Sequence, residues 1–134
     1  MASIIDIEGI GPAYDEKLQA IGIFTTEALL ERGSTPKDRE DLAVQSGISA
    51  KLILEWVNLA DLLRIDGVGE EYSDLLEEVG VDTVPELAQR NPANLHAKLV
   101  EINEAKQLVR RLPSESQVGA WIEQAKTLTR VITY

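Results

Sequence analysis

The sequence contains an internal repeat, which constrains the fold more than any other feature. Residues 7–29 and residues 65–87 align without a gap. Self-similarity of this kind indicates a chain assembled from copies of one supersecondary unit, so we expect both copies to fold in the same way. The identical pairs are Gly9 and Gly67, Gly11 and Gly69, Tyr14 and Tyr72, Leu18 and Leu76, Gly22 and Gly80, Thr25 and Thr83, and Leu29 and Leu87.

Each copy begins with two glycines on either side of one aliphatic residue. We call these segments the Gly-X-Gly turns, formed by Gly9, Ile10 and Gly11 and by Gly67, Val68 and Gly69. Such a segment suits a tight turn that exposes backbone amides while the aliphatic side chain enters the core. A helix should follow, and Pro12 suits its first turn. Gly22 and Gly80 are predicted to end these helices with a positive φ.

The remainder of the first copy is predicted to be helical. Thr25 can open a short helix, and Thr35 can open another that ends near Gly47. Ser49 can cap a longer helix that extends to about residue 64 and carries Trp56 on its apolar face. This last helix should lead into the second copy.

The second copy shows a similar succession of helix signals. Thr83 and Glu86 have the spacing of a capping box. Asn94 and Asn103 are each expected to cap a helix, and Ser114 is expected to open the last one. The second copy is therefore predicted to consist of helices separated by short turns.

The two copies differ in length. Trp56 corresponds to Trp121, which makes the second copy seven residues longer, with the insertion near residues 102–112. The final segment Val131–Tyr134 is β-prone. We predict an all-α fold with two pseudo-symmetric helix-hairpin-helix halves, residues 1–64 and 65–134. Because one motif is too small to bury a stable core, the halves should pack as one globular domain.

The turns resemble a known motif. Ile-Glu-Gly-Ile-Gly-Pro and Ile-Asp-Gly-Val-Gly-Glu look like the turn of the helix-hairpin-helix motif of many DNA repair, recombination and replication proteins. Residues 72–134, including Arg110-Arg111-Leu112-Pro113-Ser114, are similar to the small bacterial proteins called domain of unknown function 4332. The resemblance implies two helix-hairpin-helix units and assigns no activity.

The charge around the turns argues against nucleic acid as the first choice of partner. The chain has a net charge of −10. Residues 65–88 contain eight carboxylates and no Lys or Arg, and Lys17 is the one basic residue among residues 1–31. Turns that bind DNA present glycine amides to a phosphate with basic side chains beside them, whereas carboxylates repel it. A nucleic-acid-associated protein is the alternative function.

The later part of the second copy has the opposite charge. Residues 89–134 carry seven basic residues against four acidic ones, a net charge of +3. Either these charges are solvated or paired within one molecule, or they form a bipolar surface for self-association or for an acidic partner. The candidate contacts are Lys106, Arg110 and Arg111. The leading hypothesis is a non-enzymatic interaction or scaffold module that acts through protein-protein contacts.

Other chemistry has little support in the sequence. Cysteine is absent, and His96 is the single histidine, so we expect it to be structural or exposed. The acidic residues 70–78 could gather Mg²⁺, but a plain acidic face is favoured. No window is apolar enough to span a membrane, and no nucleophile or cofactor loop is recognisable. We expect a cytoplasmic protein without a cofactor, a metal site or enzymatic activity.

Overall fold

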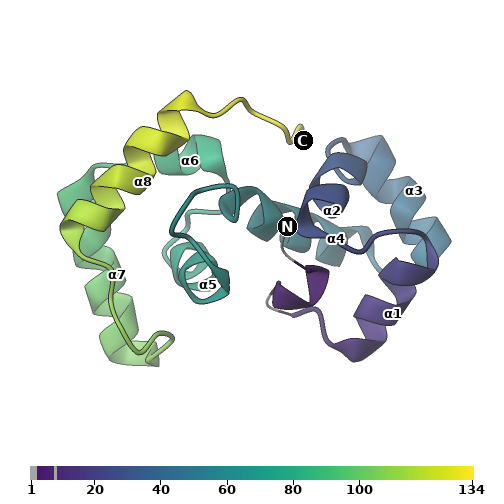
Figure 1. Ribbon diagram of the computed structural model, residues 1–134, viewed down its shortest axis with the longest axis horizontal. Helices are drawn as coiled ribbons and strands as arrows, with labels where there is room; N and C mark the ends of the chain where they lie inside the picture. Colours follow the sequence, from purple (N-terminus) through teal and green to yellow (C-terminus); the bar gives the residue numbers. More distant parts are fainter. Residues whose placement is uncertain (1–2, 8) are drawn as a thin grey trace. The chain divides into compact units, whose positions relative to one another are not determined.

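The computed structural model describes residues 3–7 and 9–134. These residues form a short 3-10 helix, η1 (Ile4–Asp6), and eight α-helices, and their β structure is limited to an isolated bridge between Ser3 and Thr25 (Figure 1). The predicted all-α class is confirmed. The chain divides into two compact units: the described residues up to Asp61 together with Val131–Tyr134, and Leu62–Arg130.

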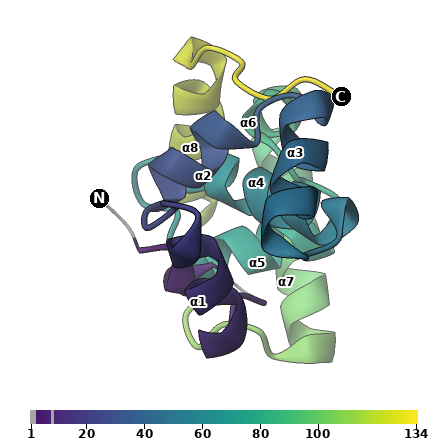
Figure 2. The same cartoon turned by 90° about the vertical axis from the view of Figure 1, so that its right-hand side faces the viewer.

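The first unit contains three complete helices and most of a fourth: α1 (Pro12–Ala20), α2 (Thr26–Arg32), α3 (Pro36–Ser46) and α4 (Ala50–Leu62). Helix α3 packs against α1 and α2 (Figure 2). The predicted caps are present. Thr25 and Thr35 each accept a hydrogen bond from the amide three residues later, at 3.1 Å, and the hydroxyl of Ser49 accepts one from Leu52 at 3.2 Å. Capping satisfies amides that have no partner inside the helix.

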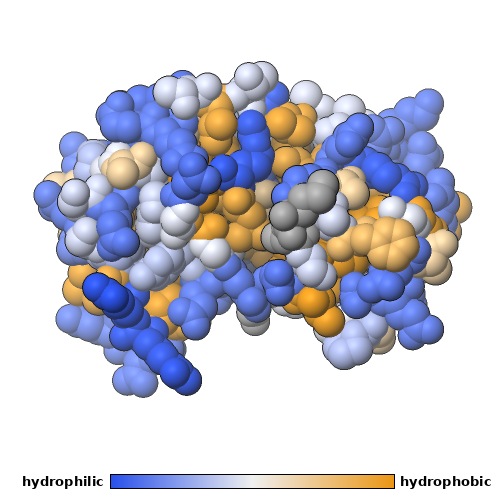
Figure 3. Space-filling model, viewed as in Figure 1, coloured by the Kyte–Doolittle hydropathy of each residue, from blue (hydrophilic) through white to orange (hydrophobic). Residues whose placement is uncertain are grey.

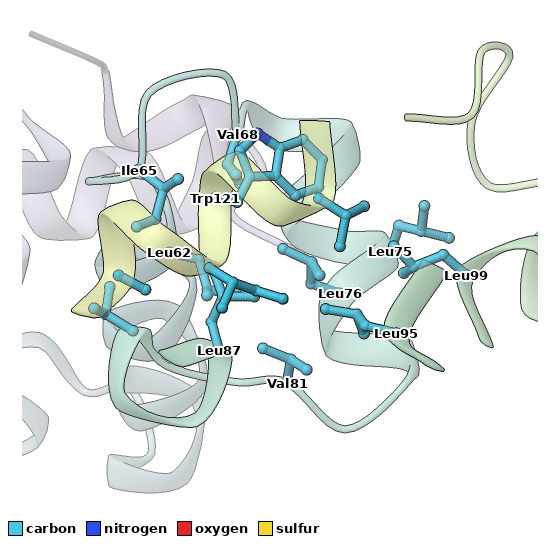
Figure 4. Close-up of a cluster of buried hydrophobic side chains, with 14 of the residues drawn as sticks. Leu62, Ile65, Val68, Leu75, Leu76, Val81, Leu87, Leu95, Leu99 and Trp121 are labelled. Carbon is cyan, nitrogen blue, oxygen red and sulfur yellow. The ribbon is translucent and has the colours of Figure 1, made fainter. Parts of the chain in front are cut away.

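The second unit contains α5 (Glu70–Glu78), α6 (Val84–Ala88), α7 (Pro92–Lys106) and α8 (Glu115–Thr127). Helix α8 packs against α6 and α7, and α5 packs against α7. Ser114 and Gln117 form a capping box at the start of α8, which confirms the expected helix start. Figure 4 shows the core between these helices, which includes Leu62, Ile65, Val68, Leu75, Leu76, Val81, Leu87, Leu95, Leu99 and Trp121.

The first glycine of each Gly-X-Gly turn has a left-handed backbone. The φ angle is 93° at Gly9 and 91° at Gly67. The aliphatic residues that follow are buried, with 4% of Ile10 and 5% of Val68 exposed. The second glycine of each turn has an extended backbone and serves as the N-cap of α1 or α5. Backbone conformation therefore requires glycine at the first position of each turn.

The ends of α1 and α5 also match. Gly22 and Gly80 have φ angles of 87° and 86°, as predicted. The guanidinium of Arg32 donates to the carbonyl of Ile21, and Arg90 Nη2 donates to the carbonyl of Val79 at 3.0 Å. Each arginine thus satisfies a carbonyl at a helix C-terminus that lacks an intrahelical partner.

A buried tryptophan packs against each turn. Trp56 and Trp121 are 2% and 3% exposed. Their rings lie 5.0 Å from Tyr14 and 5.3 Å from Tyr72, measured between centroids. Both tryptophans are core anchors, which agrees with the apolar helix face expected for Trp56, and each packs against a tyrosine.

The two glycines of one turn should respond differently to alanine. At Gly67 the added Cβ would lie 3.0 Å from the indole Nε1 of Trp121 on a backbone with φ of 91°, whereas at Gly69 it would meet no atom within 4 Å. We expect Gly67→Ala to lower the free energy of unfolding by roughly 1 to 3 kcal/mol, and Gly69→Ala by less than about 1 kcal/mol. Urea denaturation followed by circular dichroism measures both. Equal losses would contradict the assigned turn geometry.

Two predicted helix caps in the second unit were wrong. Helix α7 begins at Pro92, and Asn91 caps it by accepting from the amide of Asn94 at 3.1 Å. Asn103 lies inside α7, where its side chain binds the backbone of Val109. Proline suits the first helical position, so the cap falls on the residue before Pro92.

The capping box predicted at Thr83 does not form. Thr83 is the N-cap of α6 by position, but its hydroxyl donates to the Glu86 carboxylate at 3.4 Å and accepts no amide hydrogen bond. The extra length of the second copy lies where expected: α7 has 15 residues against 11 in α3. The non-helical residues 107–114 follow it.

The β-prone segment Val131–Tyr134 forms no strand and belongs to the first unit, although the sequence-based division assigns it to the second half. Ile132 is 2% exposed. The Thr133 amide donates to the Ser34 carbonyl at 2.8 Å, and Arg39 Nη2 donates to the Thr133 carbonyl at 2.8 Å. The end of the described chain therefore completes the first unit.

Candidate functional site

The second Gly-X-Gly turn presents amide donors among carboxylates. Within the described residues, the amides of Gly67 and Gly69 have no backbone acceptor, and the amide of Asp66 donates to Gln124 Oε1 at 2.8 Å. Asp66, Glu70 and Glu71 are exposed beside the turn. The free amides suit an anion, but the adjacent negative charges oppose one.

The first turn has a similar electrostatic character. Lys17, in the helix that follows this turn, places Nζ 5.8 Å from the ring centroid of Tyr14. One carboxylate oxygen of Asp15 accepts from Gln19 at 3.0 Å, while the other is buried without a hydrogen-bond partner in the described structure. Neither Gly11 nor Gly69 is followed by a Lys or Arg within three residues of the sequence, so the basic side chains that would add phosphate contacts next to the glycines are missing there.

The three predicted basic contacts separate into two kinds. Lys106 Nζ lies 2.6 Å from Glu78 Oε2, so this lysine is paired within its own unit. Arg110 and Arg111 are exposed and lie in the segment formed by residues 107–114, which we call the basic loop. Their guanidinium groups form no hydrogen bond or ion pair with the described residues. In Figure 3, strongly hydrophilic side chains project where this loop follows α7 in Figure 1.

The backbone of the basic loop is held by side chains from elsewhere in the second unit. Asn103 Nδ2 donates to the carbonyl of Val109 at 3.2 Å, and its Oδ1 accepts from the amide of Val109 at 3.0 Å. The hydroxyl of Tyr72 donates to the carbonyl of Arg111 at 2.9 Å. His96 Nε2 lies 3.1 Å from the Pro113 carbonyl, which only accepts, so this nitrogen carries the proton.

These bonds display the two arginines on a fixed backbone. Gln107 begins the loop with a left-handed φ of 52°, and Val109 is buried with 7% of its surface exposed. Because these hydrogen bonds already hold the loop backbone, a ligand that binds the arginines would lose less conformational entropy there.

Comparison with protein families adds one finding. The model of the family described as Domain of unknown function (DUF4332) matches residues 8–128. The chain belongs to the DUF4332 family. Comparison with curated proteins and with solved structures gives no match. Membership agrees with the resemblance seen in the sequence.

The sequence does not predict which side chains of this DUF4332 chain hold the backbone of the basic loop. Tyr72 packs against Trp121, and its hydrogen bond to the carbonyl of residue 111 spans 39 positions. His96 was expected to be structural or exposed, and it is half-buried and binds a carbonyl 17 positions away. No local pattern signals such long-range bonds.

Neither a metal site nor a membrane span is seen in the described part of the DUF4332 chain. No group of three or more His, Asp or Glu side chains is placed there to hold a metal ion. No helix among the described residues combines the length and apolar character that crossing a bilayer requires.

Proposed function

We propose that this protein is a non-enzymatic, cytoplasmic interaction module whose basic loop binds an acidic protein surface, with a second copy of the chain as the first candidate. The observation that carries the proposal is the pair of exposed, unpartnered guanidinium groups of Arg110 and Arg111 on a backbone held by Asn103 and Tyr72. Arginine suits carboxylate recognition because its planar fork donates two parallel hydrogen bonds.

The chain also carries a complementary surface. Its net charge is −10, and residues 65–88 have a net charge of −8. Exposed carboxylates there include Asp66, Glu71 and Glu86. Association of opposite surfaces on identical molecules would be weak, because exposed ion pairs contribute about 0.2 to 1 kcal/mol each and are screened by salt.

We expect the protein to associate at low ionic strength and to dissociate as salt is added. Sedimentation velocity and light scattering measure this over a salt series. The variant Arg110→Glu with Arg111→Glu should remain monomeric at every salt concentration, because both guanidinium donors are replaced by carboxylates. A matched control, Lys51→Glu with Lys126→Glu, makes the same change in net charge at exposed positions outside the loop.

Two outcomes would contradict self-association through the loop. A wild-type chain that is monomeric at every salt concentration removes the second copy as the partner. If the control variant is as fully monomeric as the loop variant, the loss of association comes from the change in net charge. The basic loop is then not the interface.

A nucleic-acid role remains the second candidate, favoured by the free amides of Gly67 and Gly69. The same protein samples can be titrated with duplex DNA at physiological salt. Salt-sensitive binding that is lost on Gly11 or Gly69 substitution would rank this function first. Because carboxylates flank the turns, we expect no binding at micromolar protein.

A further inference from the structure

In each unit a surface hollow lies beside the arginine that binds the carbonyl at the C-terminus of α1 or α5. The hollow of the first unit has a volume of about 330 Å³ and lies between α2 and α3. The hollow of the second unit has a volume of about 550 Å³ and lies where α6 leads into α7. We propose that the second hollow is an oxyanion-binding pocket that takes a phosphate or carboxylate group. It involves neither Arg110 nor Arg111, so it is independent of the proposed function.

The two hollows are lined by corresponding positions. Asp38 and Asn94 occupy the same position, since each is the third residue of its helix. In each case the residue before the helix, Thr35 or Asn91, accepts a hydrogen bond from the amide at that position. Counting from these residues aligns Asp41 with Ala97 and Leu42 with Lys98. Continuing the repeat past residues 29 and 87 at the same spacing aligns Glu31 with Gln89 and Arg32 with Arg90. All ten of these residues line the hollows.

The corresponding lining residues give the two hollows opposite net charges. Each carboxylate of the first hollow has a neutral counterpart in the second, and the second gains a lysine at the position of Leu42. The first lining carries three carboxylates and one arginine, a net charge of −2. The second carries Arg90 and Lys98 without a carboxylate, a net charge of +2. In the first hollow, carboxylates of the chain itself lie beside the arginine. In the second hollow, the cationic side chains have no carboxylate among the lining residues and can bind an anionic ligand.

The donors of the second hollow are available for a ligand. Arg90 is half-buried and oriented by its hydrogen bond to the Val79 carbonyl, which uses one of its five N–H groups. Lys98 is exposed, and its ammonium has no hydrogen bond or ion pair with the described residues. Asn91 uses its oxygen to accept from the Asn94 amide, which leaves its amide nitrogen free to donate.

Within the described structure, nearby carboxylates form no salt bridge with the two cations of this pocket. Lys98 also borders an adjacent hollow lined by Glu78 and Glu101. Glu78 is paired with Lys106 at 2.6 Å, and within the described structure Lys98 forms no salt bridge with Glu101. Two cations and several side-chain amide donors line this one open hollow and could together bind a single oxyanion. The oxyanion could be free in solution or part of a larger molecule.

A nuclear magnetic resonance titration of the full chain tests the pocket. Inorganic phosphate and acetate are added in separate series at constant ionic strength, set with sodium chloride. We expect saturable shifts of the amides of residues 89–98 and no comparable shifts at residues 31–45, which form the internal control. Binding of phosphate without acetate assigns a phosphoryl group, and equal binding of both extends the pocket to carboxylates. Either result supports an oxyanion pocket.

Two variants separate binding from folding. Lys98→Gln removes an exposed cation, and Asn94→Asp places a carboxylate where the first hollow has Asp38. Aspartate near a helix N-terminus stabilises the helix, so the second variant should fold at least as well as the wild type. Each should weaken binding on the order of tenfold through loss or opposition of a charge-assisted contact. Lys126→Gln is the charge-matched control and should bind like the wild type.

Three results would overturn the proposal. These are the absence of shifts at residues 89–98 with either anion, equal shifts in both hollows, and unchanged binding in Lys98→Gln and Asn94→Asp. Circular dichroism of each variant verifies that the helices are intact.

Discussion

Trp121→Ala is expected to lower the free energy of unfolding by about 3 to 5 kcal/mol. The indole is 3% exposed and belongs to the core of the second unit. It lies against Tyr72 with 5.3 Å between ring centroids, and its Nε1 faces Gly67. Alanine would leave a cavity among residues from several helices, which the surrounding structure cannot fill completely. Since domains are stable by only about 5 to 15 kcal/mol, a large fraction of the stability would be lost.

Urea denaturation monitored by circular dichroism measures this loss. Trp121→Phe is the matched control, because it retains an aromatic ring beside Tyr72 and should cost clearly less than alanine. If alanine and phenylalanine were equally destabilising, the effect would not come from a cavity. An alanine variant as stable as the wild type would contradict the placement of Trp121 in the core.

Arg39→Met is expected to destabilise the chain by about 3 kcal/mol. Arg39 is 5% exposed, and its two terminal nitrogens donate to the carbonyls of Gly33 and Thr133, each at 2.8 Å. Methionine fills similar space without donating, so both carbonyls would lose a buried partner. Burial lowers the pKa of Arg39, while Tyr134 and Asp38 act in the opposite direction.

Hydrogen exchange provides a second, local measurement of the same change. The Thr133 amide, which donates to Ser34 at 2.8 Å, should exchange faster in Arg39→Met because the segment Val131–Tyr134 loses one of its attachments. Arg39→Lys is the control: it keeps the charge but lacks the two-pronged fork, so we expect an intermediate effect. Unchanged exchange at Thr133 in the methionine variant would show that Arg39 does not hold this segment.

Much of the secondary structure follows from local sequence. The caps Thr25, Thr35, Ser49 and Ser114 and the positive φ of Gly22 and Gly80 were all predicted, because each depends on residues within a few positions. The prediction failed where two asparagines near one helix start could each act as the cap. Asn94 was the predicted cap, but Asn91 is the cap because it precedes the proline that begins α7.

The candidate site was predictable in part. Charge along the sequence identified Lys106, Arg110 and Arg111, but it could not show that Lys106 is paired with Glu78, 28 positions earlier. The arginines of the basic loop were found from their charge alone. The bonds from Tyr72, His96 and Asn103 that hold their backbone depend on how helices α5 and α7 and the loop come together.

The sequence by itself determined the repeat, the helical class, the turns and the division of charge, since these properties belong to residues that are neighbours in the chain. Only the tertiary structure decided that Gly67 requires a positive φ while Gly69 does not, and that Val131–Tyr134 completes the first unit. It also decided that corresponding residues of the two copies line hollows of opposite charge. The physical reason is that packing brings together groups far apart in the chain, and no local pattern records which of them will meet.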